Sequence, residues 1–391
     1  MKTLFVISAC IVVMFGIYAL YFLIHAFRNN TEDSYNTKEC DRKHFAILIP
    51  ARNEESVIGS LLESVSRLDY PKDLYDTYVL INDCTDDTEK IAASFDAVSL
   101  YCNTDTGTKG TVLEAAFGLL KDHDEADAYV IIDADNAVHP QFLEEMNRMM
   151  GTDASVIQGK RTGKLPLNTW IAQCYEIFYS FINSFFNVNG NNPGRTATIN
   201  GSGWAVSREL IDEMDFRLVT ITEDYEFSII CALNDKKIVY CDKAVVYDSF
   251  TATFRTSLIQ RLRWTYGIIQ CFRKYLKALF AKARKGSLAC FDIAMTCIMA
   301  LFIACFMVAL FITYGYIFSF LPFIIRLLII IAAFWVPVCA YAAIAVKKNG
   351  KRISELKKGI ICFPLFLISW FPILVYCLFL RECKWTQLRR S

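Results

Sequence analysis

The sequence predicts an α/β domain with a mostly parallel sheet, flanked by transmembrane helices. Between residues 45 and 132, short apolar runs alternate with segments whose apolar residues recur at helical spacing, which is the pattern of β–α–β units. Outside this region lie uncharged stretches of about 20 residues, the length of a helix that crosses a bilayer. These stretches are Leu4–Ile24, Ile293–Leu321, Leu327–Val346 and Ile360–Leu380.

Each element of the α/β domain follows from its local pattern. Strands are predicted where Ile, Val and Leu form a short run, and helices where apolar residues share one face. The predicted strands are Phe45–Ile49, Tyr78–Ile81, Ala97–Tyr101 and Tyr129–Ile132. The predicted helices are Val57–Leu68, Thr88–Phe95, Lys109–Leu120 and Trp170–Val188. A further helix is predicted to begin after Thr222, a residue type that caps helices.

Composition divides the chain into five parts. Residues 1–28 are predicted to form a transmembrane anchor, and residues 29–250 a domain that begins with the polar linker Asn29–Thr37. Residues 251–286 carry nine Lys or Arg and no Asp or Glu, and the pattern is that of basic amphipathic helices on an anionic membrane surface. Residues 287–380 contain the C-terminal transmembrane segments, and residues 381–391 form a basic tail.

The first and last apolar segments each leave two readings. Leu4–Ile24 is longer than the roughly 7–15-residue core of a signal peptide and has no Ala-x-Ala site after it, which favours a retained anchor. Four full crossings would place the basic tail on the side of the membrane opposite the α/β domain, although basic segments prefer the cytoplasm. Because Ile360–Leu380 also contains Pro364 and Pro372, we predict that it is a re-entrant hairpin.

The cysteines and histidines do not predict a metal site. The chain has 15 Cys, with no Cys-x-x-Cys pair and no Cys/His cluster at zinc spacing, which favours reduced, buried thiols. His44, His123 and His139 also lack ligand spacing and are predicted to be structural or surface residues. The net charge of +1 identifies no partner.

Polar clusters follow three of the predicted strands, at Pro50–Glu54, Asn82–Asp87 and Asp133–Asp135. The carboxyl ends of parallel strands meet at one edge of a sheet, where ligands bind. The three clusters are therefore predicted to converge there, as a nucleotide site requires.

Asp133 and Asp135 are the predicted metal ligands. Mg²⁺ is typically held by one or two carboxylates together with phosphate oxygens, and it neutralises charge on a departing diphosphate. The alternative for an isolated Asp-x-Asp is an exposed acidic turn. Its position directly after an apolar strand, with the other clusters present, favours the metal site.

Asp224 is the candidate general base, with Glu223 as the second choice. Both lie at a predicted helix start, where acidic side chains also stabilise the helix dipole, so capping alone is the competing explanation. A positioned carboxylate that removes a proton from an attacking hydroxyl contributes roughly 10²–10⁴-fold to the rate.

Gln260, Arg263 and Trp264 fall on one helical face, whereas Arg261 points elsewhere. Arg binds phosphate bidentately and an indole stacks on a sugar ring, so this face is predicted to bind the donor. The alternative is that Trp264 is an interfacial aromatic residue and that the basic side chains contact lipid headgroups. The basic side chains after it are Arg273, Lys274, Lys277, Lys282, Arg284 and Lys285.

Two weaker signals complete the candidate site. Lys109 lies at a predicted helix start, where a cation and free amides can bind phosphate, although a solvated lysine is the simpler reading. The run Gly201, Ser202, Gly203, Trp204 is predicted to shape an acceptor pocket, and on its own it is only a glycine-rich turn beside an aromatic residue.

In their order and spacing, these motifs resemble the membrane-bound family 2 glycosyltransferases, the group that includes cellulose, chitin and hyaluronan synthases. The resemblance covers roughly Phe45 to Gly267. It implies a GT-A fold, a UDP-sugar donor, inversion at the anomeric carbon, and Mg²⁺ or Mn²⁺ at Asp135 with Asp133 nearby. It also implies that Asp224 is the base and that the Gln-Arg-x-Arg-Trp helix covers the donor site beside the membrane.

The resemblance further implies donor contacts from Ala51 and Glu54. One position departs from the family pattern, because Asn82 stands where an Asp usually contacts the base, and Asp83 follows it. An amide oxygen can still accept a hydrogen bond from the base, and the identity of the contacting residue stays open.

The predicted function is transfer of a sugar from a nucleotide sugar to a growing polysaccharide or a lipid-linked glycan, by an integral membrane enzyme whose domain faces the cytoplasm. The predicted partners are the donor, the acceptor, membrane lipids and an export partner or a second copy, with no nucleic acid. A single-step glycolipid synthase is the main alternative, and a non-catalytic membrane partner a weaker one. A transporter is disfavoured, because polar residues are few within the apolar segments.

Overall fold

The computed structural model describes residues 2–28, 41–104, 108–121, 125–151, 154–214 and 216–380. The predicted linker Asn29–Thr37, His123 and the predicted basic tail 381–391 lie outside these residues. The cysteines within them are all free.

An eight-stranded sheet forms the centre of the α/β domain, in the order β3-β2-β1-β4-β7-β6-β8-β5. Its strands are β1 (Phe45–Ala51), β2 (Tyr75–Ile81), β3 (Val98–Tyr101), β4 (Ala128–Ile131), β5 (Ala137–Val138), β6 (Val156–Gly163), β7 (Trp204–Ser207) and β8 (Ile238–Asp248). The first four strands in the chain pair in parallel, with Phe45 opposite both Tyr75 and Ala128. The other half is mixed, because β7 runs antiparallel to β4 and β6 while β6 and β8 are parallel.

Helices cover both faces of the sheet, since alternate residues of each central strand are buried on opposite sides. In β1, Phe45, Ile47 and Ile49 enter one core, and Ala46 and Leu48 enter the other. The helices of this domain are α2 (Ile58–Ser66), α3 (Thr88–Ala93), α4 (Lys109–Leu120), α5 (Phe142–Met150), α8 (Arg208–Glu213) and α9 (Glu223–Leu233). The predicted α/β class is thus confirmed, and α4 has the predicted bounds.

The long helix predicted at Trp170–Val188 is interrupted. It consists of α6 (Trp170–Phe181), a π-helical turn (Ile182–Asn187) and the short α7 (Val188–Gly190). Glu176, fully buried on α6, accepts hydrogen bonds from Thr162 Oγ1 and Gly163 N of β6, which fixes this helix against the sheet.

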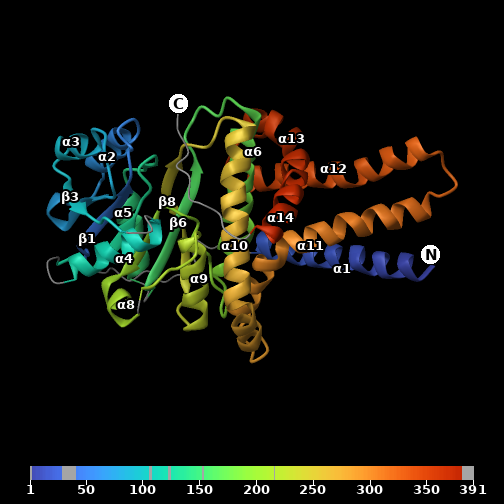
Figure 1. Ribbon diagram of the computed structural model, residues 1–391, viewed down its shortest axis with the longest axis horizontal. Helices are drawn as coiled ribbons and strands as arrows, with labels where there is room; N and C mark the ends of the chain where they lie inside the picture. Colours follow the sequence, from blue (N-terminus) through green and yellow to red (C-terminus); the bar gives the residue numbers. More distant parts are fainter. Residues whose placement is uncertain are drawn as a thin grey trace.

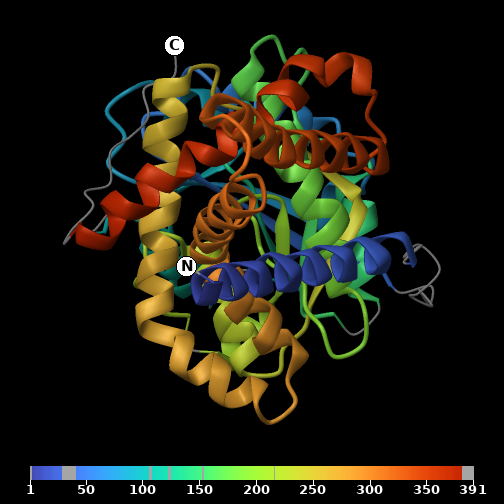
Figure 2. The same ribbon diagram turned by 90° about the vertical axis from the view of Figure 1, so that its right-hand side faces the viewer.

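The remaining helices form a separate part of the molecule. α1 (Lys2–Arg28), α11 (Leu288–Ile317) and α12 (Phe323–Lys348) project away from the α/β domain, and α10 (Phe254–Ala283) runs across their base (Figures 1 and 2). α13 (Lys357–Ile368) packs on α6, where Gly359 N donates to Gln173 Oε1, and α14 (Trp370–Phe379) packs on α10.

Within the described residues, the segments Phe323–Lys348 and Ile353–Phe379 are long and apolar enough to cross a membrane. Length and composition are weak evidence by themselves, because a buried core helix passes the same test. The second segment is broken at Ser369, which separates α13 from α14. These helices lie against α6 and α10, and the re-entrant hairpin stays a prediction.

Candidate active site at the edge of the sheet

Three elements bring Asp133, Glu223 and Asp224 around Lys109, and we call these four residues the carboxylate cluster. Lys109, the first residue of α4, lies 2.5 Å from Asp133 Oδ1 and 3.7 Å from Glu223 Oε1, measured from its Nζ atom. The same ammonium donates to the Gly201 carbonyl oxygen. Asp133 follows β4, and Glu223 and Asp224 open α9. Several predicted site residues therefore meet in space.

Two glycines allow this close approach. A Cβ on Gly110 would lie 3.1 Å from Glu223 Cβ, so only a glycine after Lys109 lets α4 approach α9 this closely without displacing it. Gly201 has a left-handed φ of +88°, and a Cβ there would lie 2.7 Å from an Arg161 guanidinium nitrogen and 3.7 Å from Asp224 Oδ2. Gly201 therefore marks where Arg161 and Asp224 come together.

Burial raises the pKa of both carboxyl groups at the start of α9. Burial raises the pKa of Glu223 to about 7, Lys109 opposes the rise, and the neighbouring charge of Asp224 adds to it. Burial also raises the pKa of Asp224, against the lowering effect of Lys109 and of the hydrogen bond from Tyr225 N. A general base works best when its pKa lies near the operating pH.

A second group, which we call the arginine cluster, consists of Asp135, Asn136, Arg161 and Asp248. Asn136 Nδ2 donates to Asp135 Oδ1 at 3.2 Å and to Asp248 Oδ1 at 3.1 Å. Arg161 contacts Asp248 Oδ2 through Nε at 2.8 Å and through a terminal nitrogen at 2.6 Å, and its remaining nitrogen donates to the Asn200 carbonyl. This group connects the Asp133–Asp135 turn to the position of Asp224.

Sequence reasoning missed Arg161 and Asp248. The available signal was a charged residue inside one strand and another at the end of a second strand. Their pairing depends on the parallel register of β6 and β8, in which Gly163 is opposite Asp248.

The ends of β1 and β2 bring together the predicted donor residues Ala51, Glu54, Asn82 and Asp83. Asn82 N donates to the Ala51 carbonyl, and Glu54 N donates to Thr88 Oγ1. Asn82 is buried, whereas Asp83 is exposed and has a left-handed φ of 50°. The backbone thus presents Asp83, not Asn82, to the outside of the sheet edge.

Asp133 and Asp135 are the carboxylates that suit a divalent ion. No group of three or more His, Cys, Asp or Glu side chains among the described residues is placed to hold a metal unaided. Two carboxylates with phosphate and water oxygens are nevertheless the usual Mg²⁺ ligand set in proteins. Asp133 Oδ1 contacts Lys109 and Asp135 Oδ1 accepts from Asn136, and a divalent ion at this turn stays a prediction.

One face of α10 carries Gln260, Arg263 and Trp264. Trp264 packs against other protein side chains, whereas Gln260 and Arg263 keep polar groups without partners among the described residues. Trp264 packs edge-on against Tyr175, with ring centres 5.9 Å apart, and stacks near Phe178 at 6.3 Å, so its indole lies against protein. Arg263 has no hydrogen bond or ion pair with another described residue, and Gln260 Oε1 is a buried acceptor without a partner. Arg263 and Gln260 are therefore available to a ligand.

Arg261 points away from this face, as predicted. It is fully buried, and its guanidinium donates to the Phe366 carbonyl at 2.9 Å and to Ser369 Oγ at 2.8 Å. This residue fastens α10 to the break between α13 and α14.

A row of stacked rings links α10 to the arginine cluster. The Arg161 guanidinium lies 4.7 Å from the ring centre of Tyr179, which stacks on Phe250 at 5.3 Å. Phe250 in turn stacks on Tyr175 at 5.7 Å, and Tyr175 contacts Trp264. The Gln-Arg-x-Arg-Trp helix and the carboxylates therefore belong to one continuous structure.

α10 also positions the turn that carries Asp224. A Cβ on Gly267 would lie 2.4 Å from Thr222 Cγ2, so the turn rests directly on the helix backbone. Glu226 accepts hydrogen bonds from the amides of Val219 and Thr220, and from Lys274 Nζ and Tyr275 OH of α10. Thr222 precedes α9 without capping it through its side chain.

One expectation needs correction. Trp204 was expected to shape an acceptor pocket, but it is 1% exposed, because β7 pairs between β4 and β6 and turns the indole into the core against Phe227. Lys274 and Lys282 pair with Glu226 and Asp235, and contact of the basic residues of this helix with a membrane surface stays a prediction. Gly201, Ser202 and Gly203 do border the carboxylate cluster, since Ser202 Oγ accepts from Asp133 N.

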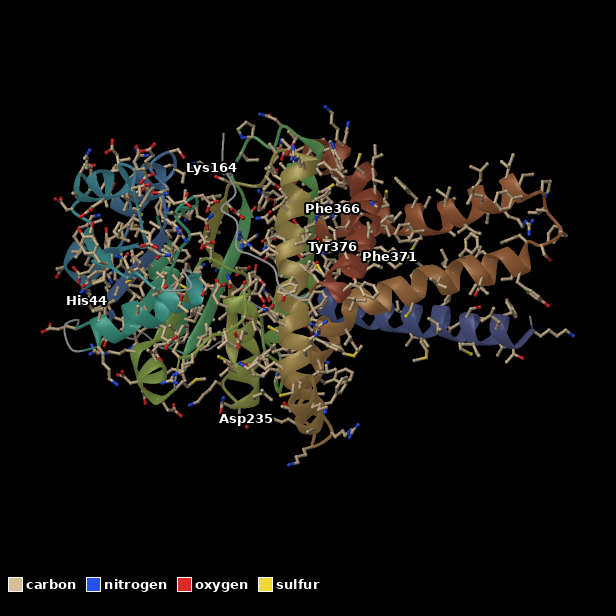
Figure 3. The ribbon with its side chains drawn as sticks, viewed as in Figure 1. His44, Lys164, Asp235, Phe366, Phe371 and Tyr376 are labelled. Atoms are coloured by element: carbon tan, nitrogen blue, oxygen red, sulfur yellow. The ribbon has the colours of Figure 1, made fainter. Side chains whose placement is uncertain are left out.

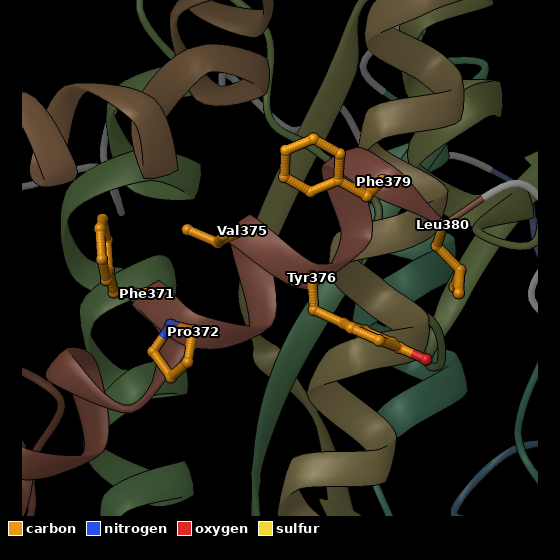
Figure 4. A pocket seen from close by; sticks show the side chains of 6 residues that line it. All are labelled: Phe371, Pro372, Val375, Tyr376, Phe379 and Leu380. Atoms are coloured by element: carbon orange, nitrogen blue, oxygen red, sulfur yellow. The ribbon is translucent and has the colours of Figure 1, made fainter.

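An apolar groove of about 540 Å³ lies on the outer side of α14 and contains none of these polar residues (Figure 4). It is lined by Phe371, Pro372, Val375, Tyr376, Phe379 and Leu380. Phe371 and Tyr376 lie close to where the projecting helices leave the domain, far from His44 (Figure 3). The groove is therefore separate from the carboxylate cluster.

The sequence of this chain is similar to those of known proteins. Residues 42–267 match the family described as glycosyltransferase like family 2. A beta-monoglucosyldiacylglycerol synthase of Nostoc sp. is 24% identical over 64% of this chain and 54% of its own length. A probable glycosyltransferase of Bacillus subtilis, YdaM, is 25% identical over 73% of this chain and 70% of its own length. The chain thus spans about half of the synthase.

A solved structure has a similar fold. The mannosyltransferase PcManGT from Pyrobaculum calidifontis, in complex with GDP-Man and Mn²⁺, superposes with a TM-score of 0.62 at 16% identity, covering 92% of this chain and 98% of that one. At this identity the likeness concerns the fold. It confirms the predicted GT-A architecture.

Proposed function

The chain belongs to the glycosyltransferase like family 2, and we propose that it transfers a sugar from a nucleotide-diphosphate donor to a membrane acceptor. The observation that carries this proposal is the carboxylate cluster, in which Asp133, Glu223 and Asp224 surround Lys109 at the carboxyl edge of the sheet. An acidic turn with a merely structural role would not bring three separate elements together in this way.

Asp224 is proposed as the base. Its carboxylate takes the proton of the acceptor hydroxyl while the acceptor oxygen forms a bond to the anomeric carbon. The bond from that carbon to the phosphate oxygen breaks, and its electron pair leaves with the nucleoside diphosphate. Because attack and departure occur on opposite faces, the transfer inverts the anomeric carbon. Glu223, with its pKa raised to about 7, is the second candidate.

Asp133 and Asp135 are proposed to hold Mg²⁺ or Mn²⁺. When bound, the ion neutralises charge on the departing diphosphate. Lys109 and Arg263 add positive charge, and Gln260 and Trp264 contribute to the wall of the donor site.

Asp83 is proposed to contact the nucleotide base, because it is exposed at the end of β2 whereas Asn82 is buried. An acidic side chain accepts a hydrogen bond from the N3–H group of uracil, and we propose UDP as the nucleotide. Ala51 and Glu54 complete this side of the site. Since PcManGT was solved with GDP-Man, a guanine nucleotide is the alternative that the donor screen must include.

The acceptor is proposed to be a lipid. The relatives named beta-monoglucosyldiacylglycerol synthase are glycolipid synthases by name. The turn that carries Asp224 rests on α10, and α10 packs on the projecting helix α11 (Figure 1). The apolar outer face of α14 and its groove suit contact with acyl chains. A cytoplasmic orientation of the domain is part of the same proposal, because nucleotide sugars are made there.

Extension of a polysaccharide or lipid-linked glycan is the second candidate. It is favoured by the order of the motifs, which resembles that of polymer synthases. An export partner or a second copy of the chain would then be needed, and the sequence leaves both open.

The test is a donor screen in lipid vesicles. Purified protein with radiolabelled UDP-hexoses, UDP-N-acetylhexosamines and GDP-mannose should yield one glycolipid with a UDP-sugar, and chelator should abolish it. A ladder of products would support polymer extension instead. If the purified protein made no product, and cells carrying Asp135→Ala or Asp224→Asn kept an unchanged glycan, the chain would be a non-catalytic partner.

A further inference from the structure

Glu226 is a buried carboxylate that no step of the proposed transfer uses. It lies in the first turn of α9, and its side chain is 0% exposed. Its Oε2 atom accepts hydrogen bonds from Val219 N at 2.8 Å and from Thr220 N at 2.7 Å. Its Oε1 atom accepts from Tyr275 OH at 2.6 Å and from Lys274 Nζ at 3.0 Å. The carboxylate therefore joins the residues before α9 to the side of α10.

The four donors around Glu226 match a carboxylate and no other side chain of this size. An ionised carboxylate accepts through both oxygens, whereas a glutamine has one acceptor oxygen and would turn its own N–H groups toward other donors. Burial opposes ionisation, but hydrogen bonds from Tyr275, Thr220 and Lys274 hold the pKa of Glu226 below its ordinary value. Glu226 is therefore ionised near neutral pH, and its hydrogen bonds are charge-assisted.

Further contacts fasten the same segment, residues 219–224, which we call the base turn because it ends at Asp224. Ile221 N donates to Gln270 Oε1 at 3.1 Å, and Thr220 Oγ1 lies 3.5 Å from Cys271 Sγ. The amides of three successive residues of the base turn are thus bonded to the side chains of Glu226 and Gln270. The residues of α10 that contact the base turn or Glu226 lie on one side of the helix, because their spacing is i, i+1, i+4 and i+5. They are Gln270, Cys271, Lys274 and Tyr275.

The same side of α10 continues to the proposed donor residues. Gly267, on which Thr222 rests, lies three residues before Gln270 and four residues after Arg263, so the three share one side of the helix. α10 is a single helix from Phe254 to Ala283. One rigid element therefore carries both the proposed donor contact and the support of the base turn.

We propose that Glu226 is a positioning residue, which acts through Asp224 by fixing the base turn to α10 at a set place relative to the donor. The proposal rests on the function proposed above, in which Asp224 is the base. A misplacement of about 1 Å in a reacting group can cost about 100-fold in rate. Glu226 should therefore affect the chemical step and leave the binding of the donor as it is.

The first test measures kinetics on the full chain in lipid vesicles, with the donor and the acceptor found in the screen. Glu226→Gln keeps the size of the side chain and should lower kcat roughly 10–100-fold, while the donor KM stays unchanged. Tyr275→Phe removes one of the four donors and should lower kcat by a smaller factor. Because Tyr275 is only half-buried, this milder variant keeps the test decisive even where Glu226→Gln folds poorly.

A double variant tells positioning of the base from a general loss of structure. Glu226→Gln is combined with Asp224→Asn, and the residual transfer of the double variant is compared with that of Asp224→Asn alone. Since Glu226 acts through Asp224, the second substitution should cause no further loss. A merely structural role of Glu226 would lower the residual rate again.

Glu176→Gln is the matched control. Glu176 is also 0% exposed, and it accepts from Thr162 Oγ1 at 2.9 Å and from Gly163 N at 2.6 Å, with Lys351 Nζ 3.7 Å away. It thus has a hydroxyl, a backbone amide and a lysine around it, as Glu226 has, but it holds α6 and not the base turn. Glu176→Gln should lower the Tm and leave kcat unchanged.

Two outcomes would overturn the proposal while the proposed function stands. One is an unchanged kcat in both Glu226→Gln and Tyr275→Phe, and the other is a donor KM that rises as much as kcat falls, which would place Glu226 at the donor site. Failure of the proposed function is a separate result. If the wild type made no product, or if Asp224→Asn kept the wild-type rate, Asp224 would not be the base and the inference would fail with it.

Discussion

The carboxylate cluster and the arginine cluster lie side by side but differ in charge balance. Lys109 faces three acidic groups, Asp133, Glu223 and Asp224, and the pKa of each of the last two is raised by burial. Arg161 faces one principal partner, Asp248, and every oxygen of that carboxylate has a donor.

This difference in charge balance indicates that the carboxylate cluster binds ligands and that the Arg161–Asp248 pair holds the structure in place. An excess of acid over base is unfavourable in a buried place, and it is relieved when a cation arrives or a proton is taken up. A buried ion pair whose charges cancel and whose oxygens are all hydrogen-bonded is not stabilised further by a ligand. We therefore assign chemistry to the carboxylate cluster and positioning to the Arg161–Asp248 pair of the arginine cluster, and the following variants test that division.

Asp224→Asn should have the largest effect on turnover. Loss of a positioned base lowers kcat by roughly 10²–10⁴-fold. The Tm should stay the same or rise, because the raised pKa of Asp224 shows that its charged form is disfavoured in the fold. Radiolabel transfer and thermal unfolding measure the two effects. A large loss of Tm would instead make Asp224 a structural residue.

Asp248→Ala should have the opposite profile, with stability as the main loss. It leaves the Arg161 guanidinium buried without its counter-charge, which costs about 3–5 kcal/mol. Chemical denaturation of the domain measures this loss. Replacing the pair together, by Arg161→Met and Asp248→Leu, should recover part of it, because a buried ion pair can be exchanged for apolar packing. Failure of the double variant to recover stability would argue for a ligand role of Asp248.

Arg263→Ala should affect only donor binding. A charge-assisted hydrogen bond is worth about 1.5–3 kcal/mol, so the donor KM should rise by roughly 10–100-fold. No stability change is expected, since Arg263 bonds to no other described side chain. Arg261→Ala is the control on the same helix, and it should destabilise the protein because that guanidinium holds α13 and α14. If Arg261→Ala raised the donor KM as much as Arg263→Ala, the two arginines could not be assigned to separate structural and donor-binding faces of α10.

Lys109→Met should have the smallest effect, which is a shift in the pH dependence of kcat. Lys109 lowers the pKa of both Glu223 and Asp224, so without it both pKa values rise. The base must be ionised to act, and the acidic limb of the kcat–pH curve should therefore move to higher pH. Activity that falls by the same factor at every pH would show that Lys109 acts only on the donor.

Structure that is decided locally could be predicted from the sequence. The strand before Asp133 and the helix that begins at Lys109 are short apolar and amphipathic patterns, and strands in parallel β–α–β units place their carboxyl ends together. That rule predicted that the clusters at Pro50–Glu54, Asn82–Asp87 and Asp133–Asp135 share one edge, because β1 pairs in parallel with both β2 and β4. Arg261 was separated from Arg263 by helical periodicity alone.

Structure that depends on pairing between residues far apart in the sequence could not be predicted. β7 is inserted antiparallel between β4 and β6, and only this placement turns Trp204 into the core. The Arg161–Asp248 pair joins residues 87 positions apart, through the register of two long strands. The π-helical turn shifts Asn183 and Asn187 relative to a regular helix, and no local sequence pattern predicts this turn.

The contact between Gly267 and Thr222 has a kinetic consequence. Because the turn that holds Asp224 rests on the backbone of α10, the base cannot leave the layer in which α10 lies. If that layer is the membrane surface, as the basic amphipathic pattern of residues 251–286 predicts, encounters with acceptor take place in two dimensions. The rate would then follow the mole fraction of acceptor among the surrounding lipids, and diluting the vesicles in buffer would leave it unchanged.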